Sequence, residues 1–172
     1  SGGCDIIEKK CLTAKKKLAI PPQSVILVYM INYDIPNSVS DFQAKTPVRG
    51  WEGIKSFEDL CFQTHPNFTD GKARQARLKF GSRDQFEISV VQNLGDGTGL
   101  YGHLDDDTYE VAMWYDGRNT MLPLSRGDDV LAHQSPIDIS RLMMVAHLND
   151  FAWVTLLHNL REECQKELGL DN

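Results

Sequence analysis

The chain has 172 residues, a formal net charge of −6, 41% hydrophobic residues and 24% charged residues. This balance is typical of a soluble globular protein and excludes the disordered and membrane-spanning classes. The longest apolar run, residues 25–31, is far shorter than the roughly 20 residues that cross a bilayer. We therefore expect no membrane contact and a single domain, residues 4–172, with its own core, while residues 1–3 are interpreted as a tag remnant.

The cysteines are too far apart in the chain for a zinc ribbon or a CxxC redox motif. The chain shows no export signal, and a protein of this size does not need disulfides. We therefore predict free thiols, a cytoplasmic location and no cofactor. No pattern in the sequence indicates an oligomeric state. The cysteines are Cys4, Cys11, Cys61 and Cys164.

Residues 4–72 are expected to form an N-terminal extension of the domain. The apolar residues in 5–18 have a weakly helical spacing, which two prolines end. The run SVILVYMINY, residues 24–33, is β-branched and aromatic and predicts a strand buried on both faces. Ser56 and Asp59 match a capping box, which predicts a short helix after them.

A period of two begins at Ala73 and predicts β-strands. The stretches QARLKF and QFEISVV place hydrophobic residues at alternate positions, and GSRD between them is typical of a turn. Together they predict a hairpin with one buried side and one solvent-facing side. On the solvent side, Arg77 and Lys79 are expected near Glu87. Such cross-strand pairs each contribute about 0.2–1 kcal/mol.

A further strand is predicted by TYEVAMWY, with Glu110 and Trp114 on its outward side. TMLPL, residues 120–124, is expected to return as another strand, and Pro123 places it at a sheet edge. Strands followed by helices favour an α+β fold. We predict an antiparallel β-sheet meander, packed on one face by C-terminal helices, in residues 73–172.

Two helices are predicted after the strands. Ser135 is a typical N-cap for the first helix, with Asp138 in its first turn. Asn149 or Asp150 is expected to cap the second helix, which Gly169 ends. The residues expected on the buried faces are Ile139, Leu142, Met143 and Ala146 in the first helix and Phe151, Val154, Leu157, Leu160, Cys164 and Leu168 in the second.

The stretch NLGDGTGLYGHLDDD, residues 93–107, is rich in glycine and aspartate. A phosphate-binding loop needs a following helix, but a strand is predicted here, and the glycine spacing does not match GxGxxG. A calcium loop needs carboxylates at alternate positions, whereas Asp105, Asp106 and Asp107 are contiguous. We therefore predict a mobile connection between strands with solvated aspartates, although loops of this length often carry a binding role.

No constellation in the sequence fixes a reaction. The histidines form no HExxH or deaminase motif, and neither a GxSxG elbow nor an activated cysteine occurs. One alternative is a metal site in which His103, Asp105 and Asp107 hold a divalent ion. Nucleic-acid binding by the basic residues 72–83 is not expected, because the chain is acidic overall and few aromatic residues lie among them.

Charge is distributed in blocks along the chain. Residues 72–83 include five bases and no acid, whereas residues 84–117 include eight acids and neither lysine nor arginine. An acidic surface of this kind suits a basic partner. Trp114 is expected either at such an interface or buried under a helix, and burial is the more frequent outcome. The residues predicted for an interaction surface are Asp96, Asp105, Asp106, Asp107, Glu110 and Trp114.

The segments FEISVVQN, LYG, TYEVAMWYDG and DDVLAHQSPIDI occur in this order within residues 80–148. Together they resemble a family of small bacteriophage proteins in which an SVV-like strand, a YE-apolar-A strand, a DDV turn and a closing helix recur. The resemblance implies a phage origin and a location in the cytoplasm of the infected host cell. It implies no particular chemistry, and no catalytic residue is carried over from it.

The leading functional hypothesis is a non-enzymatic phage accessory protein that binds and modulates a host or anti-phage-defence protein. Its binding surface is expected to combine an acidic face of the sheet with residues 93–107. One alternative is a small metal-dependent enzyme that acts on nucleotides or nucleic acid. Another is a structural component of the virion.

Overall fold

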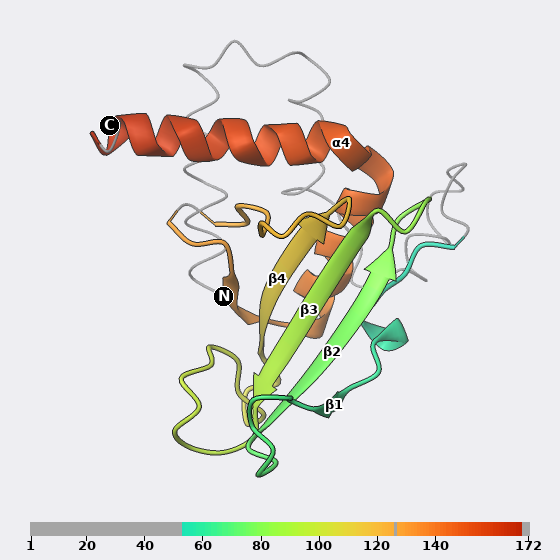
Figure 1. The fold of residues 1–172 in the computed structure, drawn as a ribbon, viewed down its shortest axis with the longest axis vertical. Helices are drawn as coiled ribbons and strands as arrows, with labels where there is room; N and C mark the ends of the chain where they lie inside the picture. Colours follow the sequence, from blue (N-terminus) through green and yellow to red (C-terminus); the bar gives the residue numbers. More distant parts are fainter. Residues whose placement is uncertain (1–52, 126, 170–172) are drawn as a thin grey trace.

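The computed structural model of the protein describes residues 53–125 and 127–169, which Figure 1 shows as a coloured ribbon. The described strands form a five-stranded antiparallel sheet in the order β1-β2-β3-β4-β5, so each strand pairs with its neighbour in the chain. This meander with a C-terminal helix confirms the predicted α+β fold. The helix predicted in 5–18 and the strand predicted in 24–33 lie outside the described residues. The elements are η1 (Phe57–Asp59), β1 (Gln63–Thr64), β2 (Ala73–Phe80), β3 (Phe86–Asn93), β4 (Tyr109–Tyr115), β5 (Leu131–Gln134) and α4 (Pro136–Glu167).

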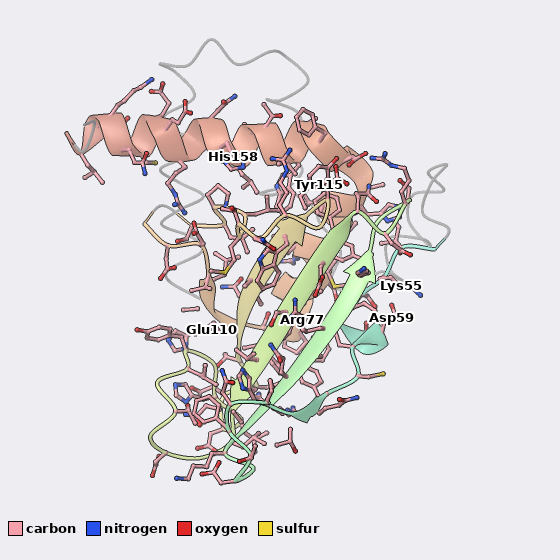
Figure 2. All side chains as sticks on the ribbon, viewed as in Figure 1. Lys55, Asp59, Arg77, Glu110, Tyr115 and His158 are labelled. Atoms are coloured by element: carbon pink, nitrogen blue, oxygen red, sulfur yellow. The ribbon has the colours of Figure 1, made fainter. Side chains whose placement is uncertain are left out.

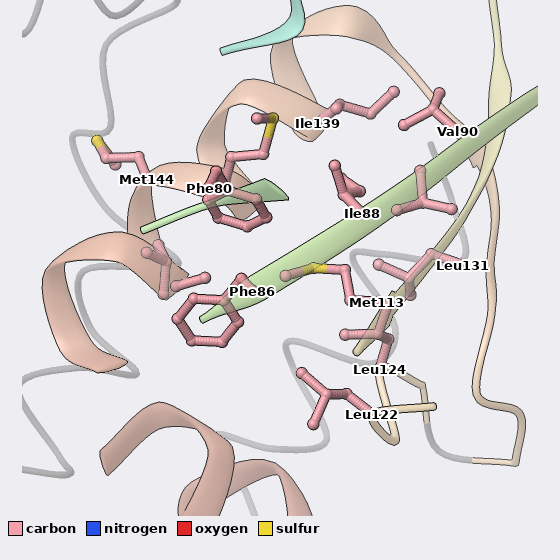
Figure 3. Packing of buried hydrophobic residues seen from close by; sticks show 14 of the residues in the cluster. Phe80, Phe86, Ile88, Val90, Met113, Leu122, Leu124, Leu131, Ile139 and Met144 are labelled. Atoms are coloured by element: carbon pink, nitrogen blue, oxygen red, sulfur yellow. The ribbon is translucent and has the colours of Figure 1, made fainter. Parts of the chain in front are cut away.

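The predicted hairpin is formed by β2 and β3, in a register that runs from Ala73 opposite Asn93 to Phe80 opposite Phe86. β4 pairs with the other side of β3, where Phe86 lies opposite Tyr115. The alternating hydrophobic residues of three strands therefore line up on one face, as the period of two predicts. Figure 3 shows how this face packs against α4 to form the core. Its most deeply buried side chains include Phe80, Phe86, Ile88, Val90, Val111, Met113, Ile139, Met143 and Met144.

The prediction of a strand at residues 120–124 is wrong, and the last strand of the described chain is β5. The Leu122 N–H donates to the Met113 carbonyl at 2.7 Å, but the Leu124 N–H turns back to the Leu122 carbonyl at 2.9 Å. Pro123 has no N–H to donate, so the segment cannot continue a ladder of hydrogen bonds. Leu122 and Leu124 are nevertheless buried. The apolar pattern of this segment correctly indicates burial, but burial does not require that the segment pairs as a strand.

η1 begins at the predicted capping box of Ser56 and Asp59, and the Ser56 N–H donates to Asp59 Oδ2 at 2.8 Å. The helix that follows is a single 3-10 turn. The Phe57 N–H donates to Ser140 Oγ of α4 at 3.0 Å. This bond joins the start of the described chain to its C-terminal helix.

α4 begins where the sequence predicts. Ser135 Oγ accepts the Asp138 N–H at 3.2 Å, and the Asp138 carboxylate accepts the Ser135 N–H at 3.2 Å, which completes a capping box. Within the helix, Asp150 has non-helical dihedral angles of φ 48° and ψ −131°. The helix changes direction there, and its second half crosses the end of the sheet (Figure 1). The boundary predicted at Asn149 or Asp150 is therefore confirmed, because two helical segments meet at Asp150 within the residues that α4 spans.

The buried side of the second half of α4 differs from the prediction. Phe151 and Leu168 are 57% and 55% exposed, although the helical spacing placed them on the core side. Trp153 is buried instead, with its ring centroid 6.0 Å from that of Phe86. Residues 151–157, FAWVTLL, are apolar on more than one side of a helix, so the helical spacing alone does not choose between a face with Phe151 and a face with Trp153. The predicted core residues that are fully buried are Ile139, Met143 and Ala146 in the first half and Val154 in the second.

Candidate interaction surface

The outward face of the sheet carries side chains of both charges. Arg77 Nε donates to Glu87 Oε1 at 2.7 Å, and the guanidinium lies 5.2 Å from the ring centre of Trp114. Lys79 lies directly opposite Glu87 in the strand register, so the predicted pairing is confirmed. Glu110 is the other acid on this face; it lies on β4 opposite Val91 of β3, and its carboxylate accepts the Tyr101 N–H at 3.1 Å (Figure 2 labels Arg77 and Glu110). The face is therefore balanced in charge, in contrast to the acidic face that the sequence predicts.

Trp114 is half-buried on the side of β4 that faces away from α4. It alternates with Met113 and Tyr115, whose side chains are buried in the core. The expectation that a helix buries Trp114 is therefore wrong for the described part of the chain. Trp114 also lies four residues along β4 from Glu110, which is about 13 Å in a strand. The structure does not bring Trp114 to the aspartate-rich loop.

The loop between β3 and β4 is hydrogen-bonded to the sheet at its base. The Asn93 N–H donates to the Gly102 carbonyl at 2.7 Å, and the Leu104 N–H donates to the Asn93 carbonyl at 3.1 Å. The Leu94 N–H donates to the carbonyl of Lys72, which precedes β2, at 2.8 Å. The two bonds of Asn93 hold residues 102–104 of the loop against the end of β3. The loop therefore begins at β3 and is also fixed to β3 near its other end.

Arg74 is the centre of a polar and aromatic cluster that holds the far end of this loop. Its Nε donates to Gln92 Oε1 at 2.8 Å, and an Nη group donates to the Tyr109 hydroxyl at 3.1 Å. The guanidinium lies 4.6 Å from the ring centre of Phe62, within reach of a cation–π contact. The Tyr109 hydroxyl donates to Asp107 Oδ1 at 3.1 Å, and burial together with this bond raises the pKa of Tyr109. Asp107 is exposed, as the sequence predicts, and this bond also ties it to the sheet.

The same loop exposes large hydrophobic side chains to solvent. Leu94, Tyr101 and Leu104 are 39%, 54% and 51% exposed, among the highest values for large hydrophobic residues in the described chain. Exposed aspartates flank them in the sequence: Asp96 follows Leu94, and Asp105 and Asp106 follow Leu104. The sequence analysis did not include these three hydrophobic residues in the interaction surface. Their position inside a loop rich in glycine and aspartate could have indicated that they are exposed. We define the loop surface as Leu94, Asp96, Tyr101, Leu104, Asp105 and Asp106.

Two imidazole rings meet at one side of the loop surface. The rings of His103 and His133 stack with centroids 5.8 Å apart, and Tyr101 contacts His133 edge-on. The His133 N–H donates to the Tyr101 carbonyl at 2.8 Å, so β5 supports the loop from its side. The metal-site alternative requires His103 to meet Asp105 and Asp107, but Asp107 bonds to a tyrosine hydroxyl. No group of three or more ligating side chains in the described residues is arranged to hold a metal ion.

A second polar cluster lies at the opposite end of the core, around Asp150. Its carboxylate accepts the Tyr115 hydroxyl at 3.0 Å and an Arg83 Nη group at 3.2 Å. Burial raises the pKa of this carboxyl, but the polar side chains of Gln85 and Tyr115 and the charge of Arg83 outweigh it and lower the pKa below 3.8. The ionised form of Asp150 is therefore stabilised in the folded protein.

Acidification from pH 5 to pH 3 is expected to destabilise the wild-type protein more than the Asp150→Asn variant. The folded-state pKa of Asp150 is lowered, so its contribution is complete above the unfolded value of 3.8 and is lost as the pH falls through the folded value. Because 37% of the side chain is exposed, solvent screening limits the difference to about 1 kcal/mol. Urea unfolding at several pH values measures the free energy of unfolding of both proteins. If this free energy changes with pH in the same way in both proteins, Asp150 is not stabilised in its ionised form by folding.

Comparison of the chain with protein-family models, with curated proteins and with solved structures found no match. In the part of the chain that the structure describes, no helix has the length and apolar character of a membrane span. The phage resemblance of residues 80–148 therefore stays a prediction, and function is inferred from the surface alone.

Proposed function

We propose that the protein is a non-enzymatic phage accessory protein that binds a host or anti-phage-defence protein through the loop surface. The observation that carries this proposal is the exposure of Tyr101 and Leu104 on a loop whose base is hydrogen-bonded to the sheet. Aromatic and apolar side chains that a scaffold already holds in place lose less conformational entropy on binding. Tyrosine in particular is enriched among the residues that dominate interface energies.

The charge of the loop surface defines the kind of partner that fits it. Asp96, Asp105 and Asp106 are exposed around the apolar residues, and Lys72, whose side chain lies beside Gly95, is paired with Asp70 at 3.3 Å. A complementary partner therefore presents an apolar pocket with lysine or arginine at its rim. Charges at the rim of an interface act mainly on the association rate and on its salt dependence, while the buried apolar contacts set the dissociation rate.

The test is recovery of the partner from lysate of a bacterial host, followed by affinity measurement with the purified partner. Tyr101→Ala is expected to weaken binding at least about tenfold, which is the effect of losing roughly 1.4 kcal/mol at a hot spot. Asp105→Asn combined with Asp106→Asn is expected to slow association and to reduce its dependence on salt. Surface plasmon resonance separates these two effects.

Leu168→Ala is the matched control for the apolar substitution. Leu168 is 55% exposed, close to the 54% of Tyr101, but it lies at the end of α4 and outside the loop surface. Its replacement is expected to leave the affinity unchanged. Recovery of the protein without any partner at low salt, or equal affinities for Tyr101→Ala and the wild type, would count against the proposal.

A further inference from the structure

We propose that the edge of β2 at Arg77 and Lys79, here called the open edge, binds an extended acidic segment of another protein as an added antiparallel strand. β1 pairs with β2 only at Arg74 and Gln75, near the start of β2 (Figure 1). In the described chain, no strand continues this pairing along the rest of the edge. The open edge is separate from the loop surface, which lies at the other end of β2 (Figure 1).

The backbone groups of β2 point alternately to its two sides, and two hydrogen bonds fix which residues face the edge. The Leu94 N–H donates to the Lys72 carbonyl at 2.8 Å, so the even-numbered residues of β2 bond to β3. The His65 N–H donates to the Ala73 carbonyl at 2.9 Å, so the odd-numbered residues face the side of β1. In an antiparallel pair, the N–H and C=O of one residue point to the same side. The backbone groups of the open edge therefore point away from β3, and no described backbone group bonds to them.

The described residues before β1 do not close this edge, because contacts with the core hold them. Phe57 of η1 packs on Tyr109 with ring centroids 5.1 Å apart, and its N–H donates to Ser140 Oγ of α4 at 3.0 Å. Unpaired edge groups are a template on which an extended segment adds a strand. In such complexes, backbone hydrogen bonds provide affinity, and alternate side chains provide specificity.

The charge of the open edge defines the segment that fits it. Arg77 and Lys79 are exposed on the outward face of the sheet. Glu87 of β3 forms an ion pair with Arg77 and lies opposite Lys79, which makes no ion pair with a described residue. Two bases therefore share one carboxylate, and the edge is positive. Opposite charges on directly facing residues of neighbouring strands attract, so acidic residues opposite the two bases are complementary.

The other face of an added strand meets apolar side chains. Leu78 alternates with the two bases on the core side of β2 and is only half-buried, whereas Phe80 is fully buried. Apolar residues that alternate with the acids would cover Leu78. A second copy of the chain does not fit, because its own β2 would place bases opposite bases, and like charges there are destabilising. The occupant is therefore a segment in which acidic and apolar residues alternate.

The test uses the full chain and a seven-residue peptide of alternating valine and glutamate with blocked ends. Hydrogen exchange of the Arg77 and Lys79 amides, measured by NMR, is expected to be fast in the free protein and at least about tenfold slower with saturating peptide. A peptide of alternating valine and lysine is expected to bind at least about tenfold more weakly, and Lys79→Glu is expected to remove this preference. Tyr101→Ala is expected to leave peptide binding unchanged, because the loop surface lies at the other end of β2.

Two N-methylated peptides are the matched controls, because they have equal charge and composition. In a strand antiparallel to β2, the glutamates lie opposite the two bases, so their N–H groups point to β2 and those of the valines point away. N-methylation of two glutamates is therefore expected to abolish binding, whereas N-methylation of two valines is expected to preserve it. Equal binding by these two peptides, or no binding by the unmethylated glutamate peptide, overturns the proposal. Slow exchange of both amides in the free protein also overturns it, because the edge would then already be paired.

Discussion

Replacing Gly102 by alanine is expected to destabilise the protein by about 3 kcal/mol, as forced overpacking against an immobile neighbour does. A Cβ at this position would contact the Tyr109 Cα and lie 2.6 Å from the Glu110 nitrogen. These are backbone atoms of β4, which is paired with β3 on one side and β5 on the other, so they cannot move aside. The loop would have to shift instead and would lose the hydrogen bond between Asn93 and Gly102.

Urea unfolding measures this loss, and Gly95→Ala in the same loop is its control. A Cβ on Gly95 would meet Lys72 Cγ at 3.6 Å, which is ordinary van der Waals contact, and its φ is not positive. Its replacement is expected to change stability by less than about 0.5 kcal/mol. Equal effects in the two variants would show that the close approach of Gly102 to β4 is not what positions the loop.

Replacing Phe86 by alanine is expected to cost about 3–5 kcal/mol, the range for truncating a fully buried aromatic residue. Phe86 has no exposed surface and packs against three other aromatic rings. Its ring centroid lies 5.0 Å from that of Tyr115, 5.4 Å from Phe80 and 6.0 Å from Trp153. It therefore joins the centre of the sheet to the second half of α4, and its loss affects both.

The free energy of unfolding is again the measurement, and Phe86→Leu is the graded comparison. Leucine fills most of the volume, so the expected cost falls to about 1.5 kcal/mol. Leu168→Ala, at an exposed position, is expected to stay within about 0.5 kcal/mol of the wild type. A loss below about 1 kcal/mol for Phe86→Ala would mean that the surrounding rings close the cavity, contrary to the close packing of protein cores.

The hairpin and β4 were predictable because one face of each strand is buried. Hydrophobic residues therefore occupy alternate positions in the sequence of each strand. Ala76, Leu78 and Phe80 show this period in β2. Residues 120–124 show it too, yet Pro123 turns the chain there, since burial alone does not specify a hydrogen-bond partner. The exposure of Phe151 was not predictable, because residues 151–157 are apolar on more than one side and only the packing of Trp153 on Phe86 selects the buried one.

The candidate site was predictable in location but not in construction. The composition of residues 93–107 singled out the loop, and four of its aspartates are exposed. The bond from Tyr109 to Asp107 and the stacking of His103 on His133 join residues whose proximity follows only from strand register. Register also places the bases of β2 beside Glu87, so the block of acidic sequence does not give an acidic face.

The meander has a consequence for the order in which the protein folds. Each described strand pairs with its chain neighbour, so the sheet can assemble through short loop closures, which carry little entropic cost. The bond from the Phe57 N–H to Ser140 Oγ instead closes a separation of 83 residues. We therefore expect the hairpins to form early in folding, and η1 to dock on α4 only after the sheet has brought the two ends of this segment together.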